Sequence, residues 1–165
     1  MAKIQKGGAV SRVLSSTPTI TAGAYSANDL VGGKISLTPA ARLVSLPSNI
    51  IPTATIINVI LTDKSTQASN TDVIFWSADP SATTFTDNAA LTVADADLLN
   101  IIGIVTVNSW TTFAANSVGT TTSAVTFPYQ LASEASTLYA SLITRGTPTY
   151  ASTSDLTLRV QMYWD

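Results

Sequence analysis

Acidic and amide side chains gather between residues 79 and 100, where they could supply oxygen ligands to Ca²⁺. An EF-hand loop that began at Asp95 would need a glycine at its sixth position and a carboxylate at its twelfth, but the twelfth residue is Thr106. Turn and capping roles account better for these side chains, so we predict no metal and no other cofactor. The residues concerned are Asp79, Asp87, Asn88, Asp95, Asp97 and Asn100.

Hydrolytic chemistry is also poorly supported by the residue types. Asp95 and Asp97 could reach the separation of about 5 to 9.5 Å between glycosidase carboxylates, but their positions favour a helix cap. A nucleophilic serine would depend on Lys34 or Lys64 as its base, because the chain has no histidine and no Gly-x-Ser-x-Gly motif. The chain also lacks cysteine and has a single glutamate, Glu134. We therefore predict that the protein is not an enzyme.

The aromatic side chains could form a stacking platform for sugar rings, since an aromatic face is apolar while a polar edge still hydrogen-bonds. Trp76 and Trp164 fall among apolar residues of expected strands, which favours positions in the core. Trp110 stands between Ser109 and Thr111 in a polar connection, so we expect it to be a surface aromatic.

The composition favours a protein that packs against other chains. Charged residues make up 11% of the 165 residues, against about a quarter in an ordinary globular domain. The mean hydropathy is +0.30, whereas a soluble monomer of this size usually covers itself with lysine and glutamate. We therefore predict a homo-oligomer with an apolar interface lined by serine and threonine.

The first 20 residues look more like an extended arm than a strand. They contain three cations and no acidic residue, so the chain up to residue 28 carries +3; since the net charge is −2, the rest carries −5. We expect the arm to take its order from a partner, on an acidic patch or an adjacent subunit. The predicted docking residues are Lys3, Ile4, Lys6, Val10, Arg12, Val13 and Leu14.

Nucleic acids and membranes are not expected as partners. Nucleic-acid binding normally requires a basic face on the folded domain, which three cations on an arm do not provide. The amino terminus lacks an apolar signal segment, and Ile101–Val105 is too short to span a bilayer. We therefore expect a protein that is made in soluble form.

Two segments near the carboxyl terminus show the period-2 alternation of half-buried strands. In Leu156–Trp164 the residues Leu158 and Val160 share one face with other apolar residues, and Arg159 points to the opposite face. Thr137–Ile143 repeats the pattern, and we expect the two strands to be neighbours.

Three other segments are apolar on both faces and predict central strands that form most of the core: Ala54–Thr62, Asp72–Trp76 and Ile101–Val107. Helix is confined to one or two turns within Val93–Asn100, with Asp95 or Asp97 as a cap. Seven or eight short strands with frequent turns predict an all-β, single-domain antiparallel β-sandwich or jelly roll. The body would span residues 21–165, after the arm at residues 1–20.

Several segments between residues 25 and 165 also carry a family resemblance. They are Leu61–Ser65, Asp72–Leu91, Ala94–Leu99 followed by Ile101–Val105, and Leu138–Ala140 followed by Arg145–Tyr150. Together these segments resemble virion proteins of tailed bacteriophages.

The resemblance implies a structural protein on the outside of a phage capsid, of the decoration or cement type. Its partner would be the major capsid protein of the same virion, and the chain would form a closed oligomer, expected as a trimer. It would be synthesised in the host cytoplasm and end in the virion. The alternative is a glycan- or receptor-binding module of a phage head or tail fibre, and a small hydrolase is the remaining candidate.

Overall fold

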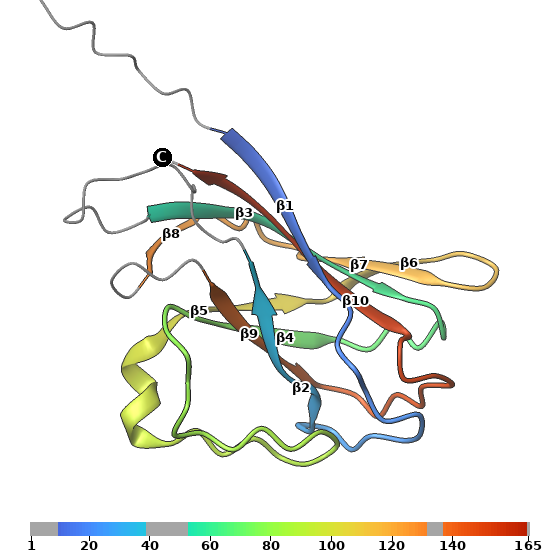
Figure 1. Ribbon diagram of the computed structural model, residues 1–165. Coiled ribbons are helices and arrows are strands. Elements are labelled where there is room, and N and C mark those ends of the chain that lie inside the picture. The colour runs from blue at the N-terminus through green and yellow to red at the C-terminus, as the bar shows by residue number, and fades with distance from the viewer. Residues whose placement is uncertain (1–9, 39–52, 132–136, 165) are drawn as a thin grey trace, which may run out of the picture.

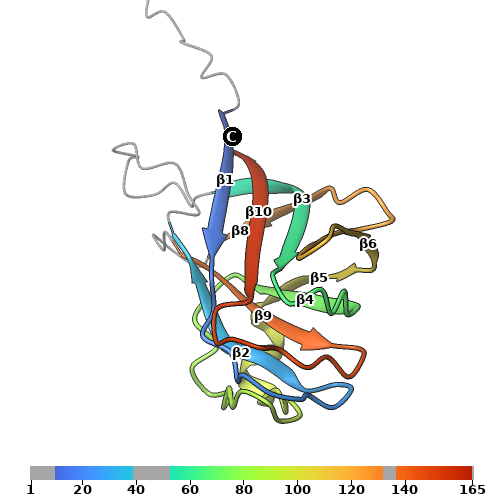
Figure 2. The ribbon, with the colours of Figure 1, turned by 90° about the vertical axis from the view of Figure 1, so that its right-hand side faces the viewer.

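The computed structural model describes residues 10–38, 53–131 and 137–164 of the chain. These residues form a sandwich of two antiparallel β-sheets, which confirms the predicted fold class (Figures 1 and 2). Within the described ranges there are ten strands and one short 3₁₀ helix, η1. The elements are β1 (Val10–Ser16), β2 (Leu30–Leu37), β3 (Thr53–Asp63), β4 (Thr71–Trp76), η1 (Asp95–Asn100), β5 (Ile101–Val107), β6 (Ser109–Thr112), β7 (Ser117–Thr120), β8 (Phe127–Gln130), β9 (Leu138–Thr144) and β10 (Leu156–Trp164).

The strands are divided between a first sheet of order β1-β10-β3-β7-β6 and a second sheet of order β2-β9-β4-β5. In the first sheet, β8 and β7 pair with the same side of β3: β8 pairs with the first residues of β3, and β7 pairs with its last residues. The expectation that β9 and β10 are neighbours is wrong, because β10 lies between β1 and β3 and β9 lies between β2 and β4. Similar alternation in two strands shows that each has one buried face, but not which strand lies beside it.

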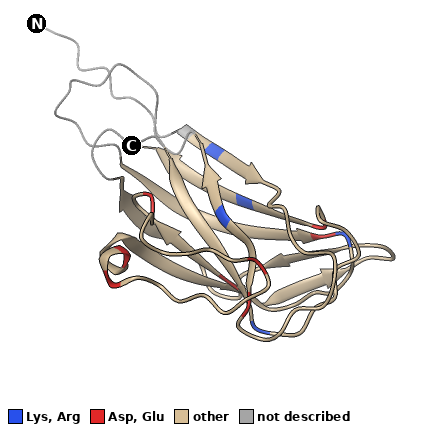
Figure 3. Ribbon diagram, turned by 60° about the horizontal axis from the view of Figure 1, so that its bottom comes forward, with Lys and Arg blue, Asp and Glu red and all other residues tan. Residues whose placement is uncertain are grey.

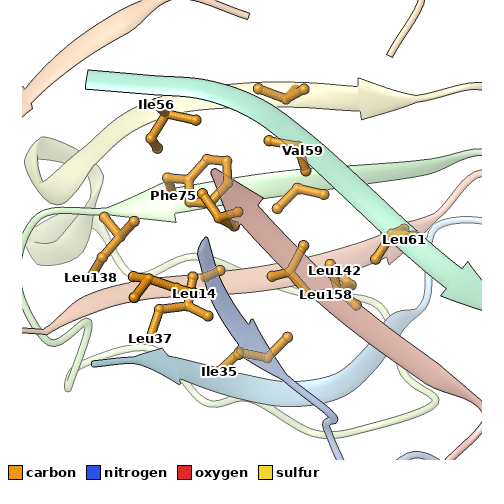
Figure 4. Close-up of a cluster of buried hydrophobic side chains, with 14 of the residues drawn as sticks. Leu14, Ile35, Leu37, Ile56, Val59, Leu61, Phe75, Leu138, Leu142 and Leu158 are labelled. Carbon is orange, nitrogen blue, oxygen red and sulfur yellow. The ribbon is translucent and has the colours of Figure 1, made fainter. Parts of the chain in front are cut away.

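Strand β10 shows the alternation that its sequence predicts. Leu158 and Val160 are fully buried, whereas Arg159 is exposed. Leu158 lies opposite Leu61 of β3 in the ladder, and Figure 4 shows its side chain in the same apolar cluster as Leu142 of β9. The space between the two sheets is therefore filled by side chains from β10 and β9 as well as from the central strands.

Strand β3 is central in its sheet, as predicted, but it is covered on one face only. Its ladder with β10 shifts between Gln161 and Met162, so that Ile57 is an extra residue on the β3 side. This bulge lets both Ile56 and Val59 point into the core although they are three residues apart. The bulge reverses which alternate residues of β3 face the core, and this is why apolar residues occur at both odd and even positions of the strand. The outer face of β3 is half-buried.

Strand β4 is covered on both faces, as predicted, while β5 is not. Val73 and Phe75 of β4 join the main core, and Trp76 on the opposite face packs edge-on against Phe85 at a centroid distance of 6.0 Å. The indole N–H of Trp76 donates to the Ser141 hydroxyl at 3.2 Å. Strand β5 is the edge of the second sheet, and its Ile104 is 58% exposed. The prediction that these three strands form most of the core is therefore wrong, since β2, β9 and β10 also contribute many of the buried side chains.

The helical segment is a single 3₁₀ helix, as its length in the sequence suggested, but neither predicted aspartate caps it. Ala94 is the N-cap residue, and its backbone N–H donates to the Thr83 hydroxyl at 3.1 Å. Thr83 in turn donates to the buried carboxylate of Asp97 at 2.7 Å. Thr83 of the preceding loop therefore links the residue before the helix to Asp97 within it, a contact that local spacing alone does not reveal.

Candidate functional site

The predicted amino-terminal arm is in part a strand. Residues 10–16 form β1, the edge of the first sheet, which pairs along its whole length with β10. Leu14 is buried in the main core and Val13 on the opposite face is 48% exposed. The expectation that residues up to 20 take their order from a partner is therefore wrong for this segment. The predicted docking residues Lys3, Ile4 and Lys6 lie outside the described residues.

Arg12 is held on the sandwich by an aromatic ring. Its guanidinium carbon lies 4.3 Å from the ring centroid of Trp164, which is itself buried at the end of β10. A cation over an indole face is stabilised by the ring quadrupole while its outer side stays in solvent. Arg12 therefore presents a positive charge at a fixed place on the edge of the first sheet, which a freely moving tail would not do.

Trp110 is half-buried and packs against the main core, so the expectation of a surface aromatic is wrong. Its indole lies over Gly119 of the paired strand β7, where a Cβ atom would come within 2.8 Å of the ring. Only glycine leaves room for the ring at this place. The indole Nε1 is buried and has no hydrogen-bond acceptor among the described residues, so Trp110 offers no polar edge to a sugar.

The acidic residues between 79 and 100 do not converge on one site. Asp79 pairs with Lys34 at 2.5 Å, Asp97 accepts from Thr83, and Asp95 is exposed. No group of three or more acidic side chains that could hold a metal ion occurs in the part of the chain that the structure describes. Each carboxylate instead has its own structural contact or faces solvent.

Asp87 joins three separate segments of the chain. Its carboxylate accepts hydrogen bonds from the backbone N–H and hydroxyl of Thr21, from the Tyr25 hydroxyl and from the N–H of Gly32. Burial raises the pKa of Tyr25 well above its usual value, and the hydrogen bond to Asp87 adds to the shift. This set of bonds fixes the segment between β1 and β2 to the loop after β4. No local sequence pattern predicted this role of Asp87.

Asp155 organises the turn before β10. Its carboxylate accepts from the Ser65 hydroxyl and from the backbone N–H groups of Ala151 and Ser152, at 2.9 and 2.8 Å for the two N–H groups. Burial of Asp155 by itself would raise its pKa, but these hydrogen bonds and the positive charge of Lys64 outweigh burial and lower the pKa below its ordinary value.

The lowered pKa of Asp155 predicts an acid-sensitive contribution to stability. This contribution is complete above the unfolded-state pKa near 3.8 and is lost as pH falls through the lower pKa of the folded protein. We expect Asp155→Asn to cost about 1–3 kcal/mol at pH 7 and to reduce the dependence of the free energy of unfolding on pH between about 5 and 2. Urea titrations at several pH values across this range measure the free energy of unfolding of each variant. Asp95→Asn, at an exposed position, is the control, and an unchanged acid slope in Asp155→Asn would contradict the assignment.

One continuous stretch of the chain carries no charged residue. Residues 98–133, which include β5 to β8, contain no lysine, arginine, aspartate or glutamate, so all 18 charged residues lie elsewhere in the chain. An open groove of 420 Å³ lies between β5 and the connection from β7 to β8. Ile104, Thr106, Val125 and Phe127 contribute to its walls. The side chains that line this groove are all uncharged, which makes it a candidate binding surface for an uncharged partner.

Large apolar side chains are exposed at several separate places. Val13 and Tyr163 lie on the outer face of β1 and β10, Leu99 on η1 is 94% exposed, and Phe113 is 55% exposed in the turn between β6 and β7. Figure 1 places η1 and the β6–β7 hairpin at opposite ends of the sandwich. The molecule therefore has apolar contacts to offer in more than one direction.

Comparison with known proteins assigns no family. No family model, curated protein or solved structure matches this chain. Among the described residues, no helix has the length and apolar character needed to cross a membrane. Function is therefore inferred from the charge, exposure and contacts of the chain's own residues.

Proposed function

We propose that this chain is a structural virion protein of a tailed bacteriophage, which binds the outside of the capsid and reinforces it. Its partners are the major capsid protein and further copies of the chain, in a closed oligomer that we expect to be a trimer. It has no catalytic role and needs no cofactor. After synthesis in the host cytoplasm it is found on the capsid exterior.

The observation that carries this proposal is the separation of the exposed apolar side chains. A protein that bridges capsid subunits needs contacts on several sides, whereas a binding module usually gathers them in one patch or pocket. Val13, Leu99 and Phe113 lie on β1, on η1 and in the β6–β7 turn, so they face different neighbours. The low share of charged residues, 11%, reduces the desolvation cost of covering these surfaces.

The polar side chains support a structural role as well. Asp87, Asp97 and Asp155 are each satisfied by hydrogen bonds from neighbouring segments of the same chain. Groups that hold loops in place in this way are not available to act as acids or bases on a substrate. The rigid sandwich and its tied loops suit a protein that must resist deformation of a shell.

The proposal is tested by co-sedimentation with empty capsids. The capsids are assembled from the major capsid protein of the proposed virion, and the bound chain is counted per capsid. We expect saturable binding with a fixed number of copies. Absence of binding, together with a specific signal on a glycan array, would overturn the proposal in favour of the receptor-binding alternative.

Deleting residues 2–9 tests the amino-terminal docking residues without removing β1. A longer deletion would take Leu14 out of the core, so any loss of binding would be ambiguous. We expect the truncated chain to melt as the full chain does and to bind capsids about tenfold more weakly, with a smaller dependence on salt because Lys3 and Lys6 are gone.

Single substitutions separate charge from length in the same assay. Lys3→Ala with Lys6→Ala should reproduce most of the loss, whereas Lys64→Ala, an exposed lysine at the other end of the first sheet, should bind normally. Capsid binding that is equally tight with and without residues 2–9 at physiological salt would show that they have no anchoring role.

A further inference from the structure

The β6–β7 hairpin and the groove at its base form two complementary uncharged features on one chain. The hairpin projects beyond the sandwich, as Figure 1 shows, and no charged residue colours it in Figure 3. Phe113 stands in its turn, where the Phe113 N–H donates to the carbonyl of Asn116 at 2.7 Å. The groove begins at the opposite end of the same hairpin, where Asn108 and Thr122 are joined by a hydrogen bond of 3.2 Å.

The hairpin tip cannot reach the groove of its own chain. Strands β6 and β7 have four residues each, about 13 Å of extended chain, and their full pairing keeps the turn away from the base. Any groove that receives the exposed Phe113 ring therefore has to belong to another molecule. The groove has the size to receive such a ring, since 420 Å³ lies within the range of about 300–1,000 Å³ found for small-molecule sites.

We infer that Phe113 of one copy docks in the groove beside Ile104 of a second copy. The inference rests on the homo-oligomer that is part of the proposed function, and it assigns the surfaces that form it. Burying Phe113 against Ile104 and Val125 removes apolar surface from water at both sites. The threonine hydroxyls of β6 and of residues 121 and 122 at the groove can then hydrogen-bond across the contact.

Charge favours a second copy over another partner at this place. The chain has a net charge of −2, to which residues 98–133 contribute nothing. Asp72, which accepts a hydrogen bond from Thr106 at the groove, is paired with Arg145. Two copies that meet here therefore bring no uncompensated like charges together. A partner with a charged surface would have to bury its charges against the uncharged side chains of the groove, with no opposite charge to pair with them. Because tip and groove are different surfaces, the contact repeats around a closed ring or is exchanged between two copies.

Sedimentation of substituted proteins tests the contact. In Phe113→Lys or Ile104→Asp a charge is placed against an apolar partner, so we expect the midpoint concentration of association to rise about tenfold or more. In the double variant the new lysine meets the new aspartate of the neighbouring copy, and association should recover. Ala96→Lys is the matched control for the added charge, because Ala96 is also exposed but lies on η1, away from the hairpin and the groove.

The outcomes distinguish this inference from the proposed function. Wild-type protein should sediment at three times the chain mass of 17.2 kDa, and twice that mass would keep the contact and correct the copy number. Both positions are exposed, so the circular dichroism spectrum, and the melting of the dissociated chain at low concentration, should stay unchanged in every variant. A wild-type monomer at all concentrations, or single variants that associate like wild type, or no recovery in the double variant, would overturn the contact. Capsid binding measured on the same proteins tests the proposed function separately.

Discussion

Replacing Leu158 by alanine is expected to lower the free energy of unfolding by about 2–5 kcal/mol. Leu158 is completely buried on β10, between Leu61 of β3 and Ser16 of β1 in the ladder, and its side chain faces the second sheet (Figure 4). Two sheets packed face to face cannot close over the missing isopropyl part of the side chain without moving a whole strand, so a cavity remains. Urea or thermal denaturation followed by circular dichroism measures the loss.

Arg159→Ala is the matched control for this experiment. Arg159 follows Leu158 directly but points to the outer face and is exposed, so its loss should change stability by no more than about 0.5 kcal/mol. The contrast between adjacent positions measures the register of β10. Comparable destabilisation at both positions would show that the strand is not buried on one face.

Gly32→Ala is expected to be as damaging, at about 2–5 kcal/mol, for two independent reasons. Gly32 has a φ of +78°, a conformation that costs an L-residue about 1–2 kcal/mol. A Cβ atom there would also lie 2.5 Å from the Cβ of Pro18 and 3.1 Å from the Cγ2 of Ile20, and relieving such a contact costs a further 1–3 kcal/mol, approximately. Movement of the backbone would in addition disturb the hydrogen bond from Gly32 to Asp87.

The adjacent glycine supplies the control. Gly33 has a similar φ of +70°, but a Cβ atom there would have no neighbour closer than 4.0 Å. Gly33→Ala should therefore show the conformational cost alone, about 1–2 kcal/mol. The difference between the two melting curves isolates the close approach of Pro18 to β2. Equal effects of the two substitutions would mean that this approach is absent in solution.

The hydrophobic pattern was enough to predict the class of fold and the buried face of the clearest strands. Period-2 alternation placed Leu158 and Val160 in the core, and the apolar run through β4 predicted a strand covered on both faces. Such patterns are local, because the pleat alone sends alternate side chains to opposite faces. Trp76 and Trp164 were assigned to the core for the same reason.

Pairing and edges were decided by tertiary structure. Residues 10–16 contain three serines and one arginine beside three apolar residues, without clear alternation, yet β1 is a strand because the free edge of β10 offers it hydrogen-bond partners. Conversely, Ile101–Val107 is apolar enough for a central strand, yet β5 ends its sheet among the described residues and leaves Ile104 exposed. Neither outcome can be read from a segment by itself, since it depends on which strand lies beside it.

The candidate site shows the same division. Residue types alone determined that the chain is poor in charge, that it lacks histidine and cysteine, and that residues 98–133 are uncharged. Only the folded chain shows that Trp110 is covered by its packing over Gly119, that Asp87 and Asp155 hold loops, and that Phe113 and the groove stand at opposite ends of one hairpin. Composition is a property of the chain, whereas exposure and proximity arise when distant segments pack, and no local signal encodes them.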